Sequence, residues 1–222
     1  TFFKFDEKKI LDIAEKARHL GAELFVLDDG WFGQRNDDHA GLGDWVANPE
    51  RLPNGIKGLS ERIEAMGIKF GLWFEPEMTN KDSVLYRAHP DWILHTPGRN
   101  ASHGRYQYVL DFSRKEVVEY IYEMMAKILS EAKVSYIKWD MNRSITECYS
   151  VALPADRQGE VFHRYILGVY DLYERLTSEF PEVLFESCSS GGGRFDPGML
   201  YYAPQGWTSD DSDAIERLKI IQ

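Results

Sequence analysis

The chain has 222 residues, of which 36 are acidic and 26 are basic, so its formal charge is −10. A surface of this sign repels polyanions, which excludes nucleic acid and anionic membranes as partners. No run of about 18 apolar residues occurs, so no stretch of the sequence is suited to span a membrane. The two cysteines, Cys148 and Cys188, are too few for a disulfide framework and favour a reducing, cytoplasmic location.

Short apolar runs alternate with stretches of helical periodicity along the whole chain. The runs predict strands over residues 2–5, 23–27, 69–74, 107–112, 136–140, 183–185 and 201–207. The helical stripes predict helices after Asp6, over 59–66, after Ser113, over 161–176 and from about 212. Ser113 and Glu116 have the spacing of a capping box at the start of the third of these helices.

This alternation is typical of a parallel sheet with helical crossovers. Two α/β architectures fit it: a (β/α)8 barrel of the TIM type and a doubly wound open sheet. The nucleotide-binding form of the open sheet is disfavoured, because no Gly-x-Gly-x-x-Gly follows the first strand and no P-loop occurs. We therefore predict one barrel domain over residues 1–222 with about six βα units, incomplete at its C-terminus by two units.

Acidic side chains follow five of the predicted strands at the point where each strand ends. They are Asp28 and Asp29, Glu75, Asp140, Glu186, and Asp210 with Asp211. Trp73 and Trp207 lie at two of the same ends. Because the carboxyl ends of barrel strands form one catalytic rim, this pattern predicts a single site that is rich in carboxylates and indoles.

Sugars suit such a rim, since hydroxyl groups need many hydrogen-bonding partners and an indole face packs on a sugar ring. Cleavage of a glycosidic bond needs two carboxyl groups with different roles. Asp140 is the better nucleophile, because Lys138 points to the same side of the strand and favours an ionised carboxylate. Asp210 is the better acid, because Asp211 and Asp213 surround it and like charges favour a protonated carboxyl.

Structural alternatives remain open from the residues alone. Asp140 could cap a helix or form an ion pair, and Trp73 could belong to the core. Cys188 has no histidine near it in sequence, which favours an inert buried thiol over a nucleophile. The glycines at 191–193 could form a flexible turn or let backbone N–H groups approach a ligand. The acids could instead hold Mg²⁺, although the six histidines show no metal-ligand spacing.

Five blocks of sequence resemble the bacterial α-galactosidases of glycoside hydrolase family 36. In order they are LDDGWF at 27–32, GLWFEPE at 71–77, KWDMNR at 138–143, ESCSSGGG at 186–193 and WTSD at 207–210. Together they cover the chain from end to end and none departs from the family pattern. The resemblance implies a retaining exo-hydrolase, without metal or cofactor, that removes terminal α-1,6-linked galactose from melibiose, raffinose and related oligosaccharides.

The resemblance also implies a role for each site residue. Asp140 matches the nucleophile and Asp210 the general acid/base. Eight further residues match positions that bind the sugar: Asp28, Asp29, Trp73, Arg105, Lys138, Asn142, Cys188 and Gly191. Asp28 and Asp29 match the pair at the 4- and 6-hydroxyls, and Cys188 and Gly191 match residues at the 2-hydroxyl.

The match covers only part of the family's length, because its flanking N- and C-terminal β-domains have no counterpart here. Family members are commonly tetramers, so the resemblance implies a homo-oligomeric parent. We expect the 222-residue chain alone to be poorly stable and weakly active. There are three alternatives: an α-N-acetylgalactosaminidase, a galactosyl-transferring relative and an inactive sugar-binding fragment. The stretch 188–193 would distinguish an α-galactosidase from the first two.

Overall fold

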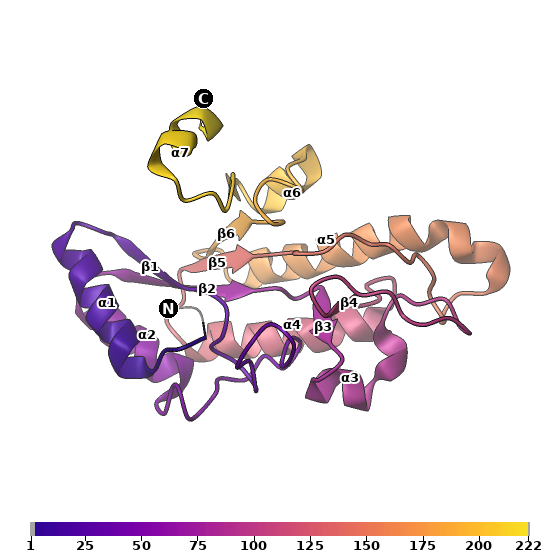
Figure 1. Ribbon diagram of the computed structural model, residues 1–222, viewed down its shortest axis with the longest axis horizontal. Helices are drawn as coiled ribbons and strands as arrows, with labels where there is room; N and C mark the ends of the chain where they lie inside the picture. Colours follow the sequence, from indigo (N-terminus) through magenta and orange to yellow (C-terminus); the bar gives the residue numbers. More distant parts are fainter. Residues whose placement is uncertain (1–2, 222) are drawn as a thin grey trace.

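The computed structural model describes residues 3–221, and a five-stranded sheet forms its centre (Figure 1). The order of the strands is β1 (Leu24–Leu27), β2 (Lys69–Phe74), β5 (Tyr136–Trp139), β6 (Leu184–Ser187) and β7 (Gln205–Gly206). All neighbouring pairs are parallel, and their order in the sheet follows their order in the chain. A doubly wound sheet reverses its strand order at a switch point, and residues 3–221 contain no such reversal.

Helices alternate with the parallel strands, as the sequence predicts: α1 precedes β1 and the others follow it. They are α1 (Glu7–His19), α2 (Gly55–Ala65), α4 (Lys115–Glu131), α5 (Val161–Glu179) and α6 (Pro197–Tyr202), with α7 (Ala214–Ile220) after the last strand. The helices also pack in chain order, α1 on α2, α2 on α4, α4 on α5 and α5 on α6. The fold is therefore an α/β arrangement in which one series of helices accompanies one parallel sheet.

The core lies between these helices and the sheet. On β2 the side chains of Phe70, Leu72 and Phe74 are fully buried. The predicted stripe of α5 is buried as well, including Val169 and Leu172. Gly168 is required where α5 approaches the chain before α4, because a Cβ atom there would lie 1.9 Å from the carbonyl oxygen of Phe112. This close packing fixes the helices against the strands that carry the site.

One predicted strand lies outside the main sheet, and another, 201–207, is confirmed only at 205–206, where β7 forms. The run 107–112 contributes β4 (Gln107–Val109), which pairs antiparallel with β3 (Met78–Asn80) outside the main sheet. The short helices α3 (Val84–Ala88), η1 (Pro90–Trp92) and, later in the chain, η2 (Ala155–Glu160) are further insertions between strands. Tyr201 and Tyr202 lie in α6 and not in a strand, because Asp196 caps that helix and Pro197 occupies its first turn.

Two smaller predictions are also corrected. Residues 3–5 form no strand, and Phe2 lies outside the described residues. The capping box at Ser113 does not form: the Ser113 hydroxyl donates to Asp111, and α4 begins at Lys115 without a side-chain cap. Asp6 caps α1 as predicted, since its Oδ1 accepts from the backbone N–H of Lys9 at 2.8 Å.

The C-terminal end of the chain is the least enclosed part of the molecule. Figure 1 shows α7 at the top of the view, apart from the long helices α4 and α5. Within residues 3–221, α7 is a helix of seven residues with no buried side chain. Across the same residues, no helix combines the length and apolar character needed to cross a lipid bilayer.

Candidate active site

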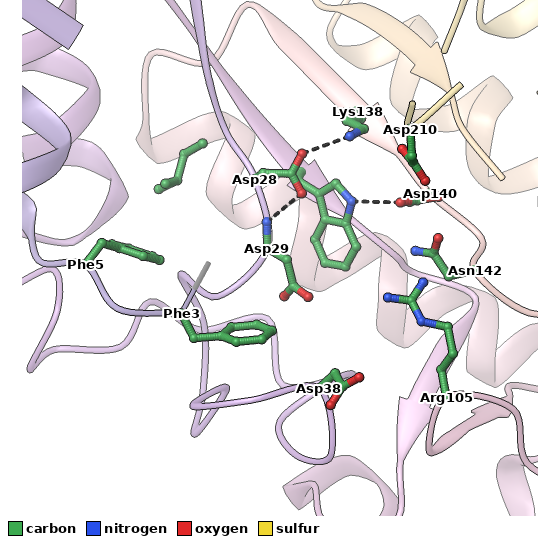
Figure 2. A pocket seen from close by; sticks show the side chains of 12 residues that line it. Phe3, Phe5, Asp28, Asp29, Asp38, Arg105, Lys138, Asp140, Asn142 and Asp210 are labelled. Carbon is green, nitrogen blue, oxygen red and sulfur yellow. Dashed lines mark hydrogen bonds and ion pairs between the residues drawn. The ribbon is translucent and has the colours of Figure 1, made fainter. Parts of the chain in front are cut away.

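A cavity of about 600 Å³ opens where the parallel strands end (Figure 2). Eight of the ten residues predicted from sequence line it, namely Asp28, Asp29, Trp73, Arg105, Lys138, Asp140, Asn142 and Asp210. Phe3, Phe5, Leu27 and Asp38 complete the lining. Cys188 and Gly191 are the two predicted residues outside this lining; Cys188 lies beside Asp140, and Gly191 packs on Ser209, the residue before Asp210.

Asp140 lies at the floor of the cavity, directly after β5, and only 6% of its surface is exposed. Its Oδ2 accepts from the indole Nε1 of Trp73 at 3.1 Å, and its Oδ1 accepts from the backbone N–H of Met141 at 2.9 Å. Its own N–H donates to the carbonyl oxygen of Phe74 at 2.8 Å. The carboxylate is thus held in one orientation by two donors and by the continuation of the sheet.

Trp73 is both a core residue and a cavity residue, so the two predicted alternatives describe the same side chain. Its backbone carbonyl accepts from the indole Nε1 of Trp31 at 2.9 Å. Its ring stacks on Phe32, with centroids 6.1 Å apart, and also packs near Trp45. This aromatic cluster of Trp31, Phe32, Trp45, Trp73 and Phe74 supports the indole that contacts Asp140.

Lys138 has a different partner from the one expected. Its Nζ donates to Asp28 Oδ2 at 2.8 Å, and it also lies 4.9 Å from the centroid of the Trp207 ring. Burial of the ammonium opposes its charge, but the ion pair with Asp28 outweighs this and raises the Lys138 pKa. The expected effect on Asp140 is therefore a minor part of what Lys138 does, and its main role is to orient Asp28.

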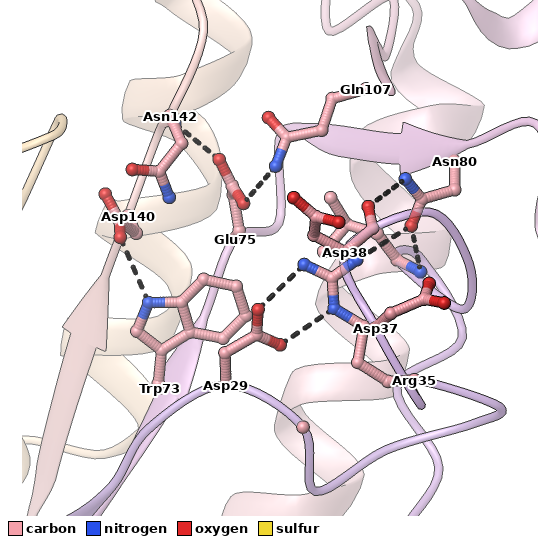
Figure 3. Close-up of polar contacts among 12 residues, drawn as sticks. Asp29, Arg35, Asp37, Asp38, Trp73, Glu75, Asn80, Gln107, Asp140 and Asn142 are labelled. Atoms are coloured by element: carbon pink, nitrogen blue, oxygen red, sulfur yellow. Dashed lines mark hydrogen bonds and ion pairs between the residues drawn. The ribbon is translucent and has the colours of Figure 1, made fainter. Parts of the chain in front are cut away.

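Asp29 is held by a residue that the sequence did not suggest. Arg35, which is 1% exposed, donates from Nε and Nη2 to the two oxygens of Asp29 at 2.9 and 2.7 Å (Figure 3). Its Nη1 donates to the Oδ1 of Asn80 at 3.0 Å. A bidentate guanidinium fixes the plane of a carboxylate, so the Asp29 side chain enters the cavity in a set orientation.

Glu75 is a fully buried carboxyl beside the cavity. Figure 3 shows it between the backbone N–H of Asn142 and the side chain of Gln107, which donates to its Oε2 at 2.8 Å. Burial raises the pKa of Glu75 to about 8, and the charge of Asp140 adds to this increase. Burial therefore favours the protonated form of Glu75, and its side chain joins the segment after β5 to the loop that bears Arg105.

Asp210 faces the same cavity from the opposite edge of the sheet, after β7 (Figure 2). It is exposed, and its Oδ1 accepts from the indole Nε1 of Trp207 at 2.8 Å. The expected like-charge neighbours are engaged elsewhere. Asp213 caps α7, and Asp211 accepts from the Asp213 backbone N–H at 2.9 Å.

Cys188 and Gly191 lie on the loop after β6. The Cys188 thiol is buried beside Asp140, and burial together with that charge raises its pKa to about 12. A thiol of this kind stays neutral, which fits the inert alternative. Gly191 has φ +89°, and a Cβ atom there would lie 3.1 Å from the Cα of Ser209. A glycine is thus needed where this loop touches the segment that leads to Asp210.

The strand-end carboxylates do not form a cluster of possible metal ligands within residues 3–221. Within residues 3–221, the one group of possible ligands close enough to share an ion is Asp37, Asp38 and His39, all on the loop after β1. Exposed acidic groups of this kind are common without an ion. The strand-end carboxylates are instead engaged by Lys138, Arg35 and indole donors, which does not favour the magnesium alternative.

The protein has a parallel α/β fold, and its strand ends bring carboxylates and indoles into one cavity. This is the fold and the kind of site expected of a glycoside hydrolase. The family model described as Melibiase matches residues 1–222, and the chain belongs to that family. Alpha-galactosidase AgaA from Geobacillus stearothermophilus is 58% identical over 220 residues, which are 99% of this chain and 30% of AgaA. Alpha-galactosidase Mel36A from Lactobacillus acidophilus is 55% identical with the same coverage.

Solved structures agree with this assignment. The crystal structure of the GH36 alpha-galactosidase AgaA superposes with a TM-score of 0.97 at 57% identity, covering 100% of this chain and 31% of that protein. Variants of AgaA have been solved in complex with raffinose and with stachyose. The chain spans about a third of the length of these relatives, so it corresponds to one part of them.

Proposed function

We propose that this chain forms the catalytic part of a retaining exo-α-galactosidase that acts on α-1,6-linked galactose at the end of melibiose- and raffinose-type oligosaccharides. The strongest support is the single cavity that both Asp140 and Asp210 line. The identity of 58% to AgaA supports the same activity, as do the AgaA complexes with raffinose and stachyose. The five parallel strands would then be the first part of a (β/α)8 barrel that longer relatives complete.

The proposed mechanism is a double displacement. The carboxylate of Asp140 attacks the anomeric carbon and forms a galactosyl ester, while the carboxyl of Asp210 protonates the departing glycosidic oxygen. Asp210, now a carboxylate, takes a proton from water as that water attacks the ester and releases galactose. Trp73 and the Met141 N–H hold Asp140 in place for the attack.

The remaining predicted residues would bind the sugar. Asp28 and Asp29, each fixed by a cation, suit the 4- and 6-hydroxyls as hydrogen-bond acceptors. Lys138, Asn142 and Arg105 would supply donors. By resemblance, Cys188 and Gly191 would border a free 2-hydroxyl, which favours a galactosidase over an α-N-acetylgalactosaminidase. The resemblance further supports a homo-oligomeric parent, and the two cysteines favour a cytoplasmic location.

A mechanism-based label tests the proposal directly. A 2-deoxy-2-fluoro-galactosyl reagent slows breakdown of the ester, so the labelled residue accumulates and can be located by mass spectrometry after digestion. We expect the label on Asp140. A label on another residue would refute the assignment of the nucleophile, and sugar binding without any label would favour the inactive sugar-binding alternative.

A further inference from the structure

A second hollow, of about 300 Å³, lies on the loop side of the catalytic cavity. Its lining is aromatic and charged and includes His39, Lys81, His103, Tyr106 and Tyr108. None of these residues was predicted from sequence, and none has a role in the proposed mechanism. The lining comes from the loop after β1, the segment after β3 and the turn before β4.

Two pairs of consecutive residues join this hollow to the catalytic cavity. Asp38 and Arg105 line the cavity, and the residue after each, His39 and Tyr106, lines the hollow. Figure 2 shows Asp38 and Arg105 together on the side of the cavity opposite Lys138. The rings of His39 and Tyr106 meet at a centroid distance of 3.7 Å. The two spaces thus share one wall, and a ligand that passes this wall would contact both.

The turn that carries Arg105 and Tyr106 directs the first side chain to the catalytic cavity and the second to the hollow. Their φ angles are +52° and +60°, in the left-handed region that ordinary residues avoid. Asn80 Nδ2 donates to the carbonyl oxygen of Tyr106 at 3.0 Å, and Arg143 Nη1 donates to that of Gln107 at 2.8 Å. Strained backbone that is held by buried side chains is common at ligand sites.

The surface of the hollow suits a neutral, hydroxylated ligand. Tyr106 is 51% exposed, and it stacks on His103 with centroids 5.7 Å apart. Nearby charges are of both signs, since Lys81 lies beside the ion pair of Arg87 and Asp82 at 2.6 Å. An anion or a cation would meet a like charge here, whereas sugar hydroxyls can use donors and acceptors together and a sugar ring can lie on the tyrosine.

We propose that this hollow binds the sugar units beyond the terminal galactose, so that Tyr106 is a platform for the rest of the oligosaccharide. This inference rests on the proposed α-galactosidase function for its ligand. It predicts that preference for longer substrates is determined at the β3–β4 segment, separately from the chemistry at Asp140.

Substrates of different length test this proposal. The assay uses the protein with the additional domains that its longer relatives have. Tyr106→Asn is the variant of choice, because asparagine tolerates the left-handed conformation, and His103→Ala is a second variant in the same hollow. Both should lower kcat/KM for stachyose by about tenfold, the loss expected for one aromatic contact. Both should change kcat/KM for p-nitrophenyl α-galactoside by less than about twofold. Phe162→Ala on α5, which is 53% exposed, is the matched control and should affect neither substrate.

The outcomes separate this proposal from the proposed function. Equal losses on both substrates would mean that Tyr106 supports the catalytic cavity, and unchanged stachyose hydrolysis would mean that the hollow binds no sugar. Either result overturns the inference while the galactosidase function stands. If the unsubstituted protein hydrolyses neither substrate, calorimetric titration with stachyose and with galactose decides instead. Weaker binding of stachyose alone in Tyr106→Asn would support the inference without the activity, and unchanged binding would refute it.

Discussion

The two carboxyl groups proposed for catalysis lie in different surroundings. Asp140 follows a central strand, is almost fully buried, and is held by an indole, a backbone N–H and the sheet itself. Asp210 follows the two-residue strand β7 at the edge of the sheet and is exposed. Its support is the indole of Trp207, and the helix that follows has no buried side chain within the described residues.

The sheet therefore holds the two sides of the site with different firmness. The side formed by β1, β2 and β5 is preorganised by paired strands and by the ion pairs of Asp29 with the buried Arg35 and of Asp28 with Lys138, so it can fix the proposed nucleophile and the two acids proposed to bind the sugar. The strand β7 has only two residues, and the helix after it has no buried side chain within the described residues. We therefore expect Asp210 to be held less firmly than Asp140.

The largest expected effect is on the preorganised side. Asp140→Asn keeps the shape of the side chain but removes the nucleophile, so we expect kcat/KM for p-nitrophenyl α-galactoside to fall by about a thousandfold or more. Azide, a small anion that can take the place of the carboxylate, should restore part of the turnover and release β-galactosyl azide, because a single displacement inverts the anomeric carbon. If β-galactosyl azide formed with Asp210→Asn but not with Asp140→Asn, the two roles would have to be exchanged.

A stability comparison sharpens the contrast between the two sides. Leu172 on α5 is fully buried and Leu218 on α7 is 58% exposed. Leu172→Ala should lower the free energy of unfolding by about 2–5 kcal/mol because it leaves a cavity in the core. Leu218→Ala should cost less than about 0.5 kcal/mol, as usual for an exposed site. Urea denaturation measures both, and a similar cost at Leu218 would show that α7 is packed in solution.

The sequence predicted those parts of the site that follow directly from strand ends. Apolar runs that stop at acids and indoles are visible without a structure, so Asp28, Trp73 and Asp140 could be assigned to one rim. The alternation of strands and helices likewise predicted the parallel sheet. Local signals were less reliable where tertiary contacts decide, since the predicted strand 201–207 is reduced to β7 at 205–206 with Tyr201 and Tyr202 in a helix, and the capping box at Ser113 is absent.

The partners of the site residues could not be predicted in the same way. Lys138 was assigned to Asp140 because the two are close in sequence, whereas its partner Asp28 is 110 residues away and two strands distant. Arg35 and Asp38 lie on a loop without periodicity, and no pattern marks an arginine that will be buried. Tyr106 also lies on a loop, so the second hollow becomes visible only when the turn before β4 is folded.

The buried carboxyl of Glu75 should make the stability of the folded protein depend on pH. The unfolded chain loses the Glu75 proton near the ordinary pKa of 4.5, but the folded protein keeps it to about pH 8. The folded state therefore binds the extra proton between these values, and its stability falls as pH rises, by at most about 1.4 kcal/mol per unit. Thermal melts from pH 5 to 8 should show this loss in the unsubstituted protein, and Glu75→Gln should remove it. Parallel profiles for the two proteins would contradict the raised pKa of Glu75.

The smallest effects concern the two indoles that donate to the catalytic carboxyls. Trp73→Phe removes a buried donor to Asp140, and a hydrogen bond to a charged group contributes about 1.5–3 kcal/mol. We expect kcat/KM to fall by about tenfold or more. Trp207→Phe removes the equivalent bond to Asp210, but water can replace it there, so the loss should stay below about threefold.

A third tryptophan supplies the control for this pair. Trp45 is buried in the same aromatic cluster as Trp73, and its Nε1 has no hydrogen-bond partner among the described residues. Trp45→Phe therefore repeats the loss of ring volume without the loss of a donor. If Trp45→Phe were as damaging as Trp73→Phe, packing and not the bond to Asp140 would explain the result. If Trp207→Phe were as damaging as Trp73→Phe, the edge of the sheet would be as well ordered in solution as its centre.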